Sequence, residues 1–131
     1  MKILLLLIAL TTLSCNQENT SLTEVSSSFK YSLSQNSELK KNHEGDYVLS
    51  VGGGRFFITK SVNVTKIHAP DLVISTSNGD FEIHIEKELI KILVHASDIE
   101  ISSPYVMSFV PEIVKANEKI QFDRINKVFI R

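Results

Sequence analysis

Three histidines each stand three residues before an aspartate, a spacing that could support metal binding or proton exchange. The pairs are His43 and Asp46, His68 and Asp71, and His95 and Asp98. Imidazole is a common ligand of transition metals and changes charge near neutral pH. An aspartate in such a position can instead accept hydrogen bonds from backbone amides and so cap a turn. A metal site needs ligands of defined geometry, and the sequence shows only a periodicity, so we favour turn capping and predict no metal.

Other motifs that carry chemistry give little support for catalysis. Acidic residues in turns can bind calcium, but the Gly-Gly-x-Gly-x-Asp repeat of calcium-binding β-rolls does not occur. Gly52-Gly53-Gly54-Arg55 lacks the following helix and Lys-Ser/Thr pair of a phosphate loop, so it is predicted to be a hairpin loop. No nucleophile elbow and no His-Glu-x-x-His sequence is present. The sequence therefore predicts a protein that is not an enzyme and that has no cofactor.

The elements that carry these pairs belong to an internal repeat. The ten residues from Ile67 to Thr76 return in similar form as Val94 to Ser103, and the core of the pattern appears earlier as His43 to Ser50. This core reads His-x-x-Asp-apolar-x-apolar-Ser. Repetition at a fixed spacing is typical of structurally equivalent β units.

Alternation of apolar and polar residues runs through the chain after Phe29 and predicts an all-β domain. Apolar pairs recur every nine residues, which is the length of a strand and its turn: 72/74, 81/83, 90/92 and 99/101. Two architectures fit. The 27-residue separation of His68 and His95 favours a short β-helix or solenoid-like stack of strands, whereas Asn78-Gly79 and the triple glycine favour an antiparallel β-sandwich or meander. We favour the solenoid and keep the sandwich as the alternative.

The N-terminal segment has the features of an export signal. A positive Met1-Lys2 precedes the uncharged run from Ile3 to Leu13, which is too short to span a bilayer of about 30 Å as a helix. The run ends at Ser14-Cys15, which resembles the lipobox of bacterial lipoproteins, where the cysteine becomes the acylated first residue. We therefore expect a signal peptide at 1–14, a lipidated Cys15 with a flexible polar tether over 15–28, and a single all-β domain at 29–131.

The composition of the chain limits the classes of partner and of covalent cross-link that we expect. Cys15 is the only cysteine, so no intramolecular disulfide can form. The formal net charge is −1, and no basic cluster indicates nucleic acid. The expected partners are the membrane, through the N-terminal lipid, and an unidentified protein or surface.

The segment from Val62 to Ser103 is similar to the auto-transporter adhesin head domain called GIN. The similarity lies in Ala69-Pro70-Asp71-Leu72 and in Ser77-Asn78-Gly79-Asp80, where Asn78 departs from the family's Ser-Gly-Ser-Gly-Asp turn. The resemblance implies an exported bacterial protein with β-helical repeats, often a lipoprotein, and supplies no site residues.

Together these features predict a non-catalytic, lipid-anchored protein of the bacterial envelope, located at the outer membrane or cell surface. The favoured function is a surface display or adhesion-type β module. The alternative is a periplasm-facing envelope accessory or inhibitor protein. A metal- or pH-responsive set of histidines is a third hypothesis.

Overall fold

The computed structural model describes residues 22–60, 63–105 and 111–131, and these residues form thirteen β-strands. In chain order the strands are β1 (Thr23–Ser26), β2 (Phe29–Leu33), β3 (Glu38–Lys41), β4 (Tyr47–Val51), β5 (Gly53–Ile58), β6 (Thr65–Ala69), β7 (Leu72–Thr76), β8 (Gly79–Ile85), β9 (Leu89–Ala96), β10 (Ile99–Ser102), β11 (Glu112–Val114), β12 (Lys119–Asp123) and β13 (Val128–Ile130). The described residues contain no helix long and apolar enough to cross a membrane. The prediction of an all-β domain is confirmed.

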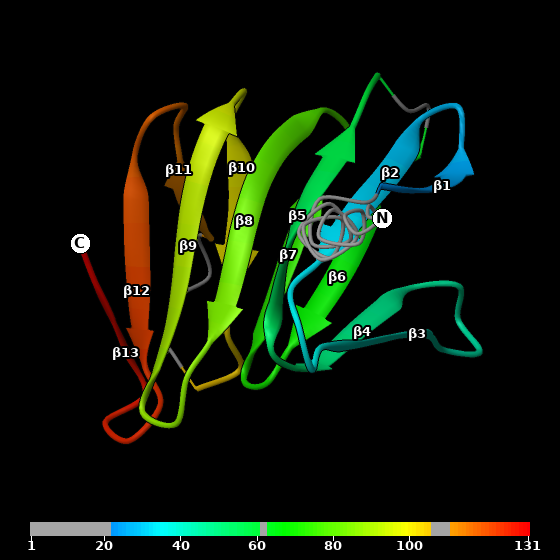
Figure 1. The fold of residues 1–131 in the computed structure, drawn as a ribbon. Helices are drawn as coiled ribbons and strands as arrows, with labels where there is room; N and C mark the ends of the chain where they lie inside the picture. Colours follow the sequence, from blue (N-terminus) through cyan, green and yellow to red (C-terminus); the bar gives the residue numbers. More distant parts are fainter. Residues whose placement is uncertain (1–21, 61–62, 106–110) are drawn as a thin grey trace, which may run out of the picture.

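The strands form two sheets (Figure 1). Sheet A has seven strands in the order β1-β2-β5-β8-β9-β12-β13, and all its pairs are antiparallel. Sheet B has six strands in the order β11-β10-β7-β6-β4-β3. Its pairs are antiparallel except for β4 and β6, which run parallel.

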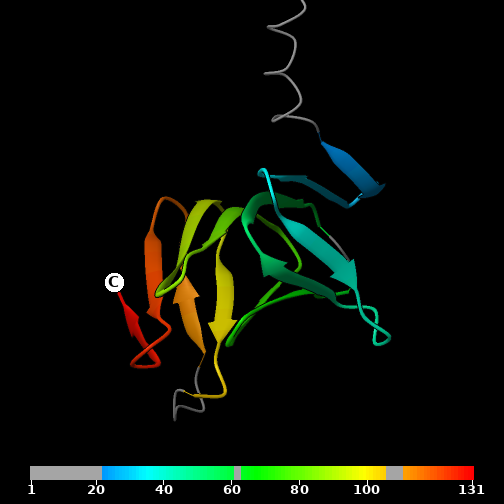
Figure 2. The same ribbon diagram turned by 60° about the horizontal axis from the view of Figure 1, so that its bottom comes forward.

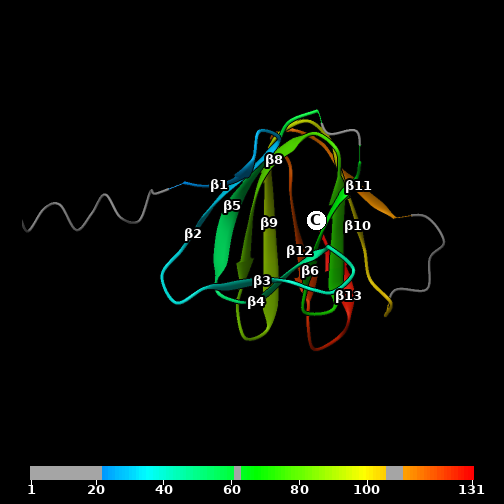
Figure 3. The same ribbon diagram turned by 90° about the vertical axis from the view of Figure 1, so that its right-hand side faces the viewer.

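The chain passes back and forth between the sheets as it advances from one side of the domain to the other. The β1–β2 and β3–β4 hairpins lie at one side, and the β12–β13 hairpin lies at the other (Figure 2). In Figure 3, β5, β8 and β9 of sheet A face β6 and β10 of sheet B. This arrangement fits the antiparallel β-sandwich that the sequence offered as its alternative.

The core lies between the inner faces of the sheets, because every second residue of the central strands is buried. Strand β8 alternates buried and partly exposed positions from Gly79 to Ile83, and β7 does so from Leu72 to Thr76. The Phe56 and Phe81 rings stack with centroids 5.6 Å apart. All eight residues of the predicted apolar pairs are at most 2% exposed: Leu72, Ile74, Phe81, Ile83, Ile90, Ile92, Ile99 and Ile101.

The structure does not confirm the stacked solenoid. In a solenoid, the strands of successive repeat copies pair in parallel, one coil apart. Here the equivalent strands β7 and β10 pair antiparallel, with Ser75 opposite Glu100 and Ile74 opposite Ile101. The copies also turn differently. Pro70-Asp71 closes the β6–β7 hairpin within sheet B, whereas Ser97-Asp98 carries the chain from sheet A to sheet B.

Two segments that favour antiparallel pairing in the sequence, one predicted as a hairpin and the other as a hairpin or tight turn, are crossings between the sheets. The triple glycine joins β4 of sheet B to β5 of sheet A, and Ser77-Asn78 joins β7 of sheet B to β8 of sheet A. Gly52 has φ +87°, which explains a glycine at this crossing. Gly53 and Gly54 lie inside β5, where a Cβ on Gly54 would approach the backbone oxygen of Ser32 to 2.8 Å.

Strand β1 falls within the range 15–28 that the sequence predicts to be a tether. Its residues are all exposed, and among the described residues it pairs with β2 alone, at the edge of sheet A. The predicted signal peptide and Cys15 lie outside the described residues.

Candidate functional site

The histidines of the repeat lie on both sheets, so they do not line up along one edge. His68 lies on β6 of sheet B, and its Nε2 is 3.0 Å from Oδ2 of Asp46, just before β4. Because an ionised carboxylate only accepts hydrogen bonds, the imidazole donates. The parallel register, with Val48 opposite His68, brings these two copies of the repeat together. His68 therefore contacts the aspartate of the preceding copy and not its own Asp71.

The second His–carboxylate cluster lies on the outer face of sheet A. Glu82 of β8 accepts hydrogen bonds from Nε2 of His84 (2.9 Å) and of His95 (2.6 Å). Strand β9 carries a β-bulge, because Asp80 pairs with Ala96 and the next residue, Phe81, pairs with Val94. His95 lies between these two partners and is the extra, unpaired residue of the bulge. The hydrogen bonds from His84, and then from His95, lower the pKa of Glu82. His95 belongs to the repeated His-x-x-Asp pattern, whereas Glu82 and His84 lie outside it, although the alternation of the sequence places 82 and 84 on one face of a strand.

The remaining predicted site residues are dispersed. Asp71 has φ +69° in the β6–β7 turn, and its Oδ2 is 2.8 Å from Nζ of Lys127 in the β12–β13 turn. That ammonium also lies 4.6 Å from the ring centroid of Tyr105. His43 is exposed in the β3–β4 turn, and Asp98 is exposed before β10. The roles of these residues in turn capping or metal binding remain predictions.

Several turns are capped by other side chains. Oδ1 of Asn42 accepts hydrogen bonds from the amides of Glu44 and Asp46, each at 2.9 Å. Oδ1 of Asp123 accepts from the amides of Ile125 and Asn126. The pKa of Asp123 is lowered by these hydrogen bonds, and the backbone amide of Asn126 contributes most. Asparagine and aspartate act here as turn residues commonly do.

Among residues 22–60, 63–105 and 111–131, no group of three or more His, Cys, Asp or Glu residues is placed to hold a metal ion. In the Glu82 cluster, Nε2 of His84 and Nε2 of His95 each contact the carboxylate of Glu82.

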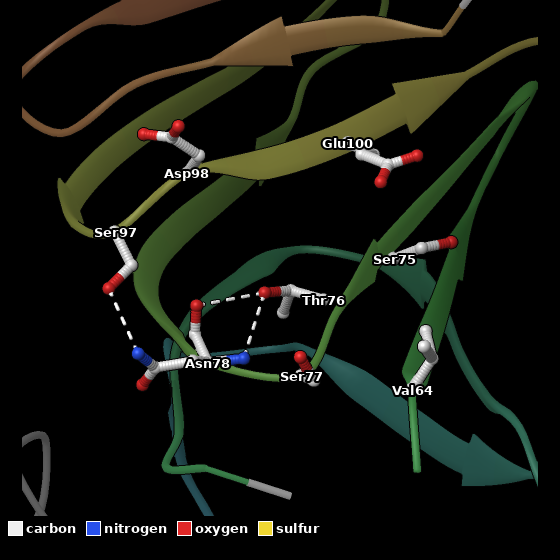
Figure 4. Close-up of a pocket in the computed structure, with 8 residues that line it drawn as sticks. All are labelled: Val64, Ser75, Thr76, Ser77, Asn78, Ser97, Asp98 and Glu100. Carbon is white, nitrogen blue, oxygen red and sulfur yellow. Dashed lines mark hydrogen bonds between the residues drawn. The ribbon is translucent and has the colours of Figure 1, made fainter. Parts of the chain in front are cut away.

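A pocket of about 500 Å³ opens where two sheet crossings lie side by side (Figure 4). We call it the crossing pocket, and its lining consists of Val64, Ser75, Thr76, Ser77, Asn78, Ser97, Asp98 and Glu100. Seven of these side chains are polar. Asp98 and Ser97 come from the third copy of the repeat, and Ser75 and Thr76 end the second.

Hydrogen bonds shape the crossing pocket. The hydroxyl of Thr76, a residue that is 7% exposed, donates to the backbone oxygen of Asn78 and accepts from its amide, at 2.9 and 3.1 Å. Nδ2 of Asn78 donates to Oγ of Ser97 at 3.3 Å and so links the two crossings (Figure 4). The sequence signal for this site is Asn78-Gly79, which indicates a hairpin or a tight turn.

Comparisons with known proteins show likeness at the level of fold. No family model matches the chain, and no curated protein matches its sequence. The chain is similar to two crystal structures of a "putative anti-sigma factor from Parabacteroides distasonis ATCC 8503". Their TM-scores are 0.71 and 0.65, with 13% and 14% sequence identity. Each match covers 84% of this chain and 53% of the other, so this chain spans about half the length of the solved structures and shares their β fold.

Proposed function

We propose that this chain is a bacterial envelope lipoprotein whose β domain is displayed as a non-catalytic binding module. The observation that carries the proposal is the order of segments along the chain. An uncharged apolar run ends at the only cysteine, Cys15, a polar segment follows, and an all-β domain comes next. Several acyl chains on Cys15 would anchor such a protein, because each buried CH₂ contributes about 0.8 kcal/mol.

The position of β1 is compatible with a displayed domain. Strand β1 lies at the edge of sheet A, and the residues that line the crossing pocket come from other parts of the described chain. The resemblance of Val62 to Ser103 to the GIN domain supports an exported adhesion-type module. The sandwich in place of a β-helix removes one feature that the resemblance implied.

A periplasm-facing accessory or inhibitor is the second candidate, and one observation favours it. The solved structures with the same fold carry the name of anti-sigma factor, which describes action on another protein. In this alternative the domain faces the periplasm and restrains a protein there. The likeness covers 53% of those chains, so their named activity is a hypothesis for this one.

Protease shaving of intact cells separates the two locations. Cells producing the full chain are treated with a protease, and antibodies to residues 29–131 are used on intact and lysed samples. Surface display predicts that the domain is lost from intact cells while a periplasmic marker protein survives. Protection until lysis would contradict surface display and favour the periplasmic alternative.

A Cys15→Ser variant tests the anchor in the same cells. The lipoprotein proposal predicts that the native chain fractionates with membranes and that the variant does not. The matched control is Ser14→Ala, which keeps a small residue before the cysteine. Equal membrane association of Cys15→Ser and the native chain would contradict lipid anchoring at Cys15.

A further inference from the structure

We propose that the crossing pocket binds a neutral, polyhydroxylated ligand, that is, a short carbohydrate. This deepens the proposed binding function, and it rests on that function only for the source of the ligand, the envelope or its surroundings. The volume of about 500 Å³ lies within the range of roughly 300–1,000 Å³ that is typical of small-molecule sites.

The pocket is built on fixed backbone. Its two crossings leave the paired strands β7 and β10 of sheet B and join the paired strands β8 and β9 of sheet A. Ile74 and Ile99, next to the lining residues, are at most 1% exposed and anchor β7 and β10 in the core. The Asn78–Ser97 hydrogen bond then links the crossings to each other. A site on such a scaffold needs little reorganisation to bind a ligand.

Several polar groups of the pocket have unused hydrogen-bonding capacity. Within the described part of the chain, the carboxylates of Asp98 and Glu100 form no ion pair and no hydrogen bond. The hydroxyls of Ser75 and Ser77 form no hydrogen bond with the described residues either. Some carboxylates elsewhere are engaged, such as Asp80 with Arg55 at 2.9 Å. The pocket therefore offers carboxylate acceptors beside hydroxyls that can both donate and accept.

The two carboxylates, of Asp98 just before β10 and of Glu100 within β10, do not converge on one point. Asp98 and Glu100 stand two residues apart on the same side of the chain, and their side chains extend in different directions (Figure 4). A calcium ion needs six to eight oxygens around a single centre. The spacing instead suits a ligand long enough to contact each carboxylate through a different group.

The hydroxyl groups of a sugar match the hydrogen-bonding groups of this lining better than the cationic groups of a basic peptide do. Ammonium and guanidinium groups only donate hydrogen bonds, so they would leave the hydroxyl donors of Ser75 and Ser77 unmatched. Sugar hydroxyls both donate and accept. The 58%-exposed Val64 offers an apolar contact for sugar C–H groups.

The test is nuclear magnetic resonance titration of the purified, isotopically labelled protein with cellobiose, maltose, lactose and N,N′-diacetylchitobiose. The proposal predicts saturable shift changes centred on residues 75–78 and 97–100 with at least one of these sugars. It also predicts that Asp98→Ala/Glu100→Ala weakens that binding by about tenfold or more, as expected for hydrogen bonds to charged acceptors. The control, Glu44→Ala/Glu88→Ala, removes two exposed carboxylates outside the pocket and should leave binding unchanged.

Three results would overturn the proposal: no response to any of the sugars, a response that Asp98→Ala/Glu100→Ala leaves intact, or saturation of the pocket by calcium chloride or a lysine-rich peptide but not by sugar. The backbone spectrum of each variant shows whether it is folded. This titration needs no cells, whereas protease shaving reports location alone. Failure of the carbohydrate proposal is therefore distinguishable from failure of the envelope proposal.

Discussion

Replacing Gly52 by alanine should destabilise the protein strongly, because two separate costs meet at this residue. Gly52 has φ +87°, in the left-handed region that disfavours a side chain by about 1–2 kcal/mol. An added Cβ would overlap Oγ of Ser37 and lie 2.7 Å from Cα and Cβ of Ser37. Forced overlap of this kind costs about 1–3 kcal/mol.

The overlap would also disturb hydrogen bonds that hold the sheet crossing in place. Oγ of Ser37 donates to the backbone oxygen of Gly53 at 2.9 Å and accepts from the Gly53 amide at 2.8 Å. Each such hydrogen bond contributes about 0.5–1.5 kcal/mol. Taking the backbone strain, the overlap and the two hydrogen bonds together, we expect Gly52→Ala to lower the free energy of unfolding by about 3–8 kcal/mol.

Gly45→Ala is the matched control. Gly45 has φ +89°, almost the same as Gly52, but a Cβ there would meet no atom within 4 Å. Only the backbone cost of about 1–2 kcal/mol should remain. Urea unfolding followed by far-ultraviolet circular dichroism measures both variants, since the chain has no Trp. Equal losses in the two variants would refute the reasoning that Gly52 is required by the close approach of Ser37.

Further predictions concern the core, a charged cluster and a turn contact. Ile74→Ala, at a fully buried position, should lower the free energy of unfolding by about 2–5 kcal/mol. Ser75→Ala, on the outer face of the same strand, should change it by less than about 0.5 kcal/mol. Equal urea midpoints for the two variants would contradict this assignment of faces. Glu82→Gln should cost about 1 kcal/mol at neutral pH. Because folding lowers the pKa of Glu82, its contribution is present above the unfolded-state pKa of about 4.3 and is lost as the pH falls through the lower folded-state pKa. The stability gap between native and variant protein should therefore close in acid, and a gap that persists there would count against the hydrogen bonds from His84 and His95 to the ionised Glu82 carboxylate. Lys127→Met removes the contacts with Asp71 and Tyr105 and should lower the free energy of unfolding by about 1 kcal/mol in thermal unfolding. The control, Lys115→Met, should leave the stability unchanged. A similar effect of both changes would argue against the contact between the turns.

The strands could be predicted from the sequence because alternation is a local property. Whether Phe81 or Glu82 faces the core depends on the pleat of one strand, and the apolar pairs of the repeat are indeed buried. The sheet that a strand joins depends on distant residues. Gly52 and Asn78-Gly79 are strong turn signals, yet only the packing of two sheets decides that they form crossings and not hairpins.

The repeat shows the same limit within a single motif. The left-handed residue is Asp71 in the second copy but Ser97, one position earlier in the motif, in the third. Similar residues thus support two different turns. The sequence could not predict the hydrogen-bond partner of His68 either, because Asp46 approaches His68 through the parallel register of β4 and β6. The crossing pocket depends on the same long-range pairing, here of β7 with β10.

The central claim is that Cys15 is the acylated first residue of the mature chain, and intact-mass spectrometry of the protein extracted from bacterial membranes tests it most directly. The account predicts a mass equal to residues 15–131 plus the mass of attached acyl chains, and no peptide from residues 1–14 after digestion. An unmodified Cys15, or a mature chain that begins at another residue, would contradict it.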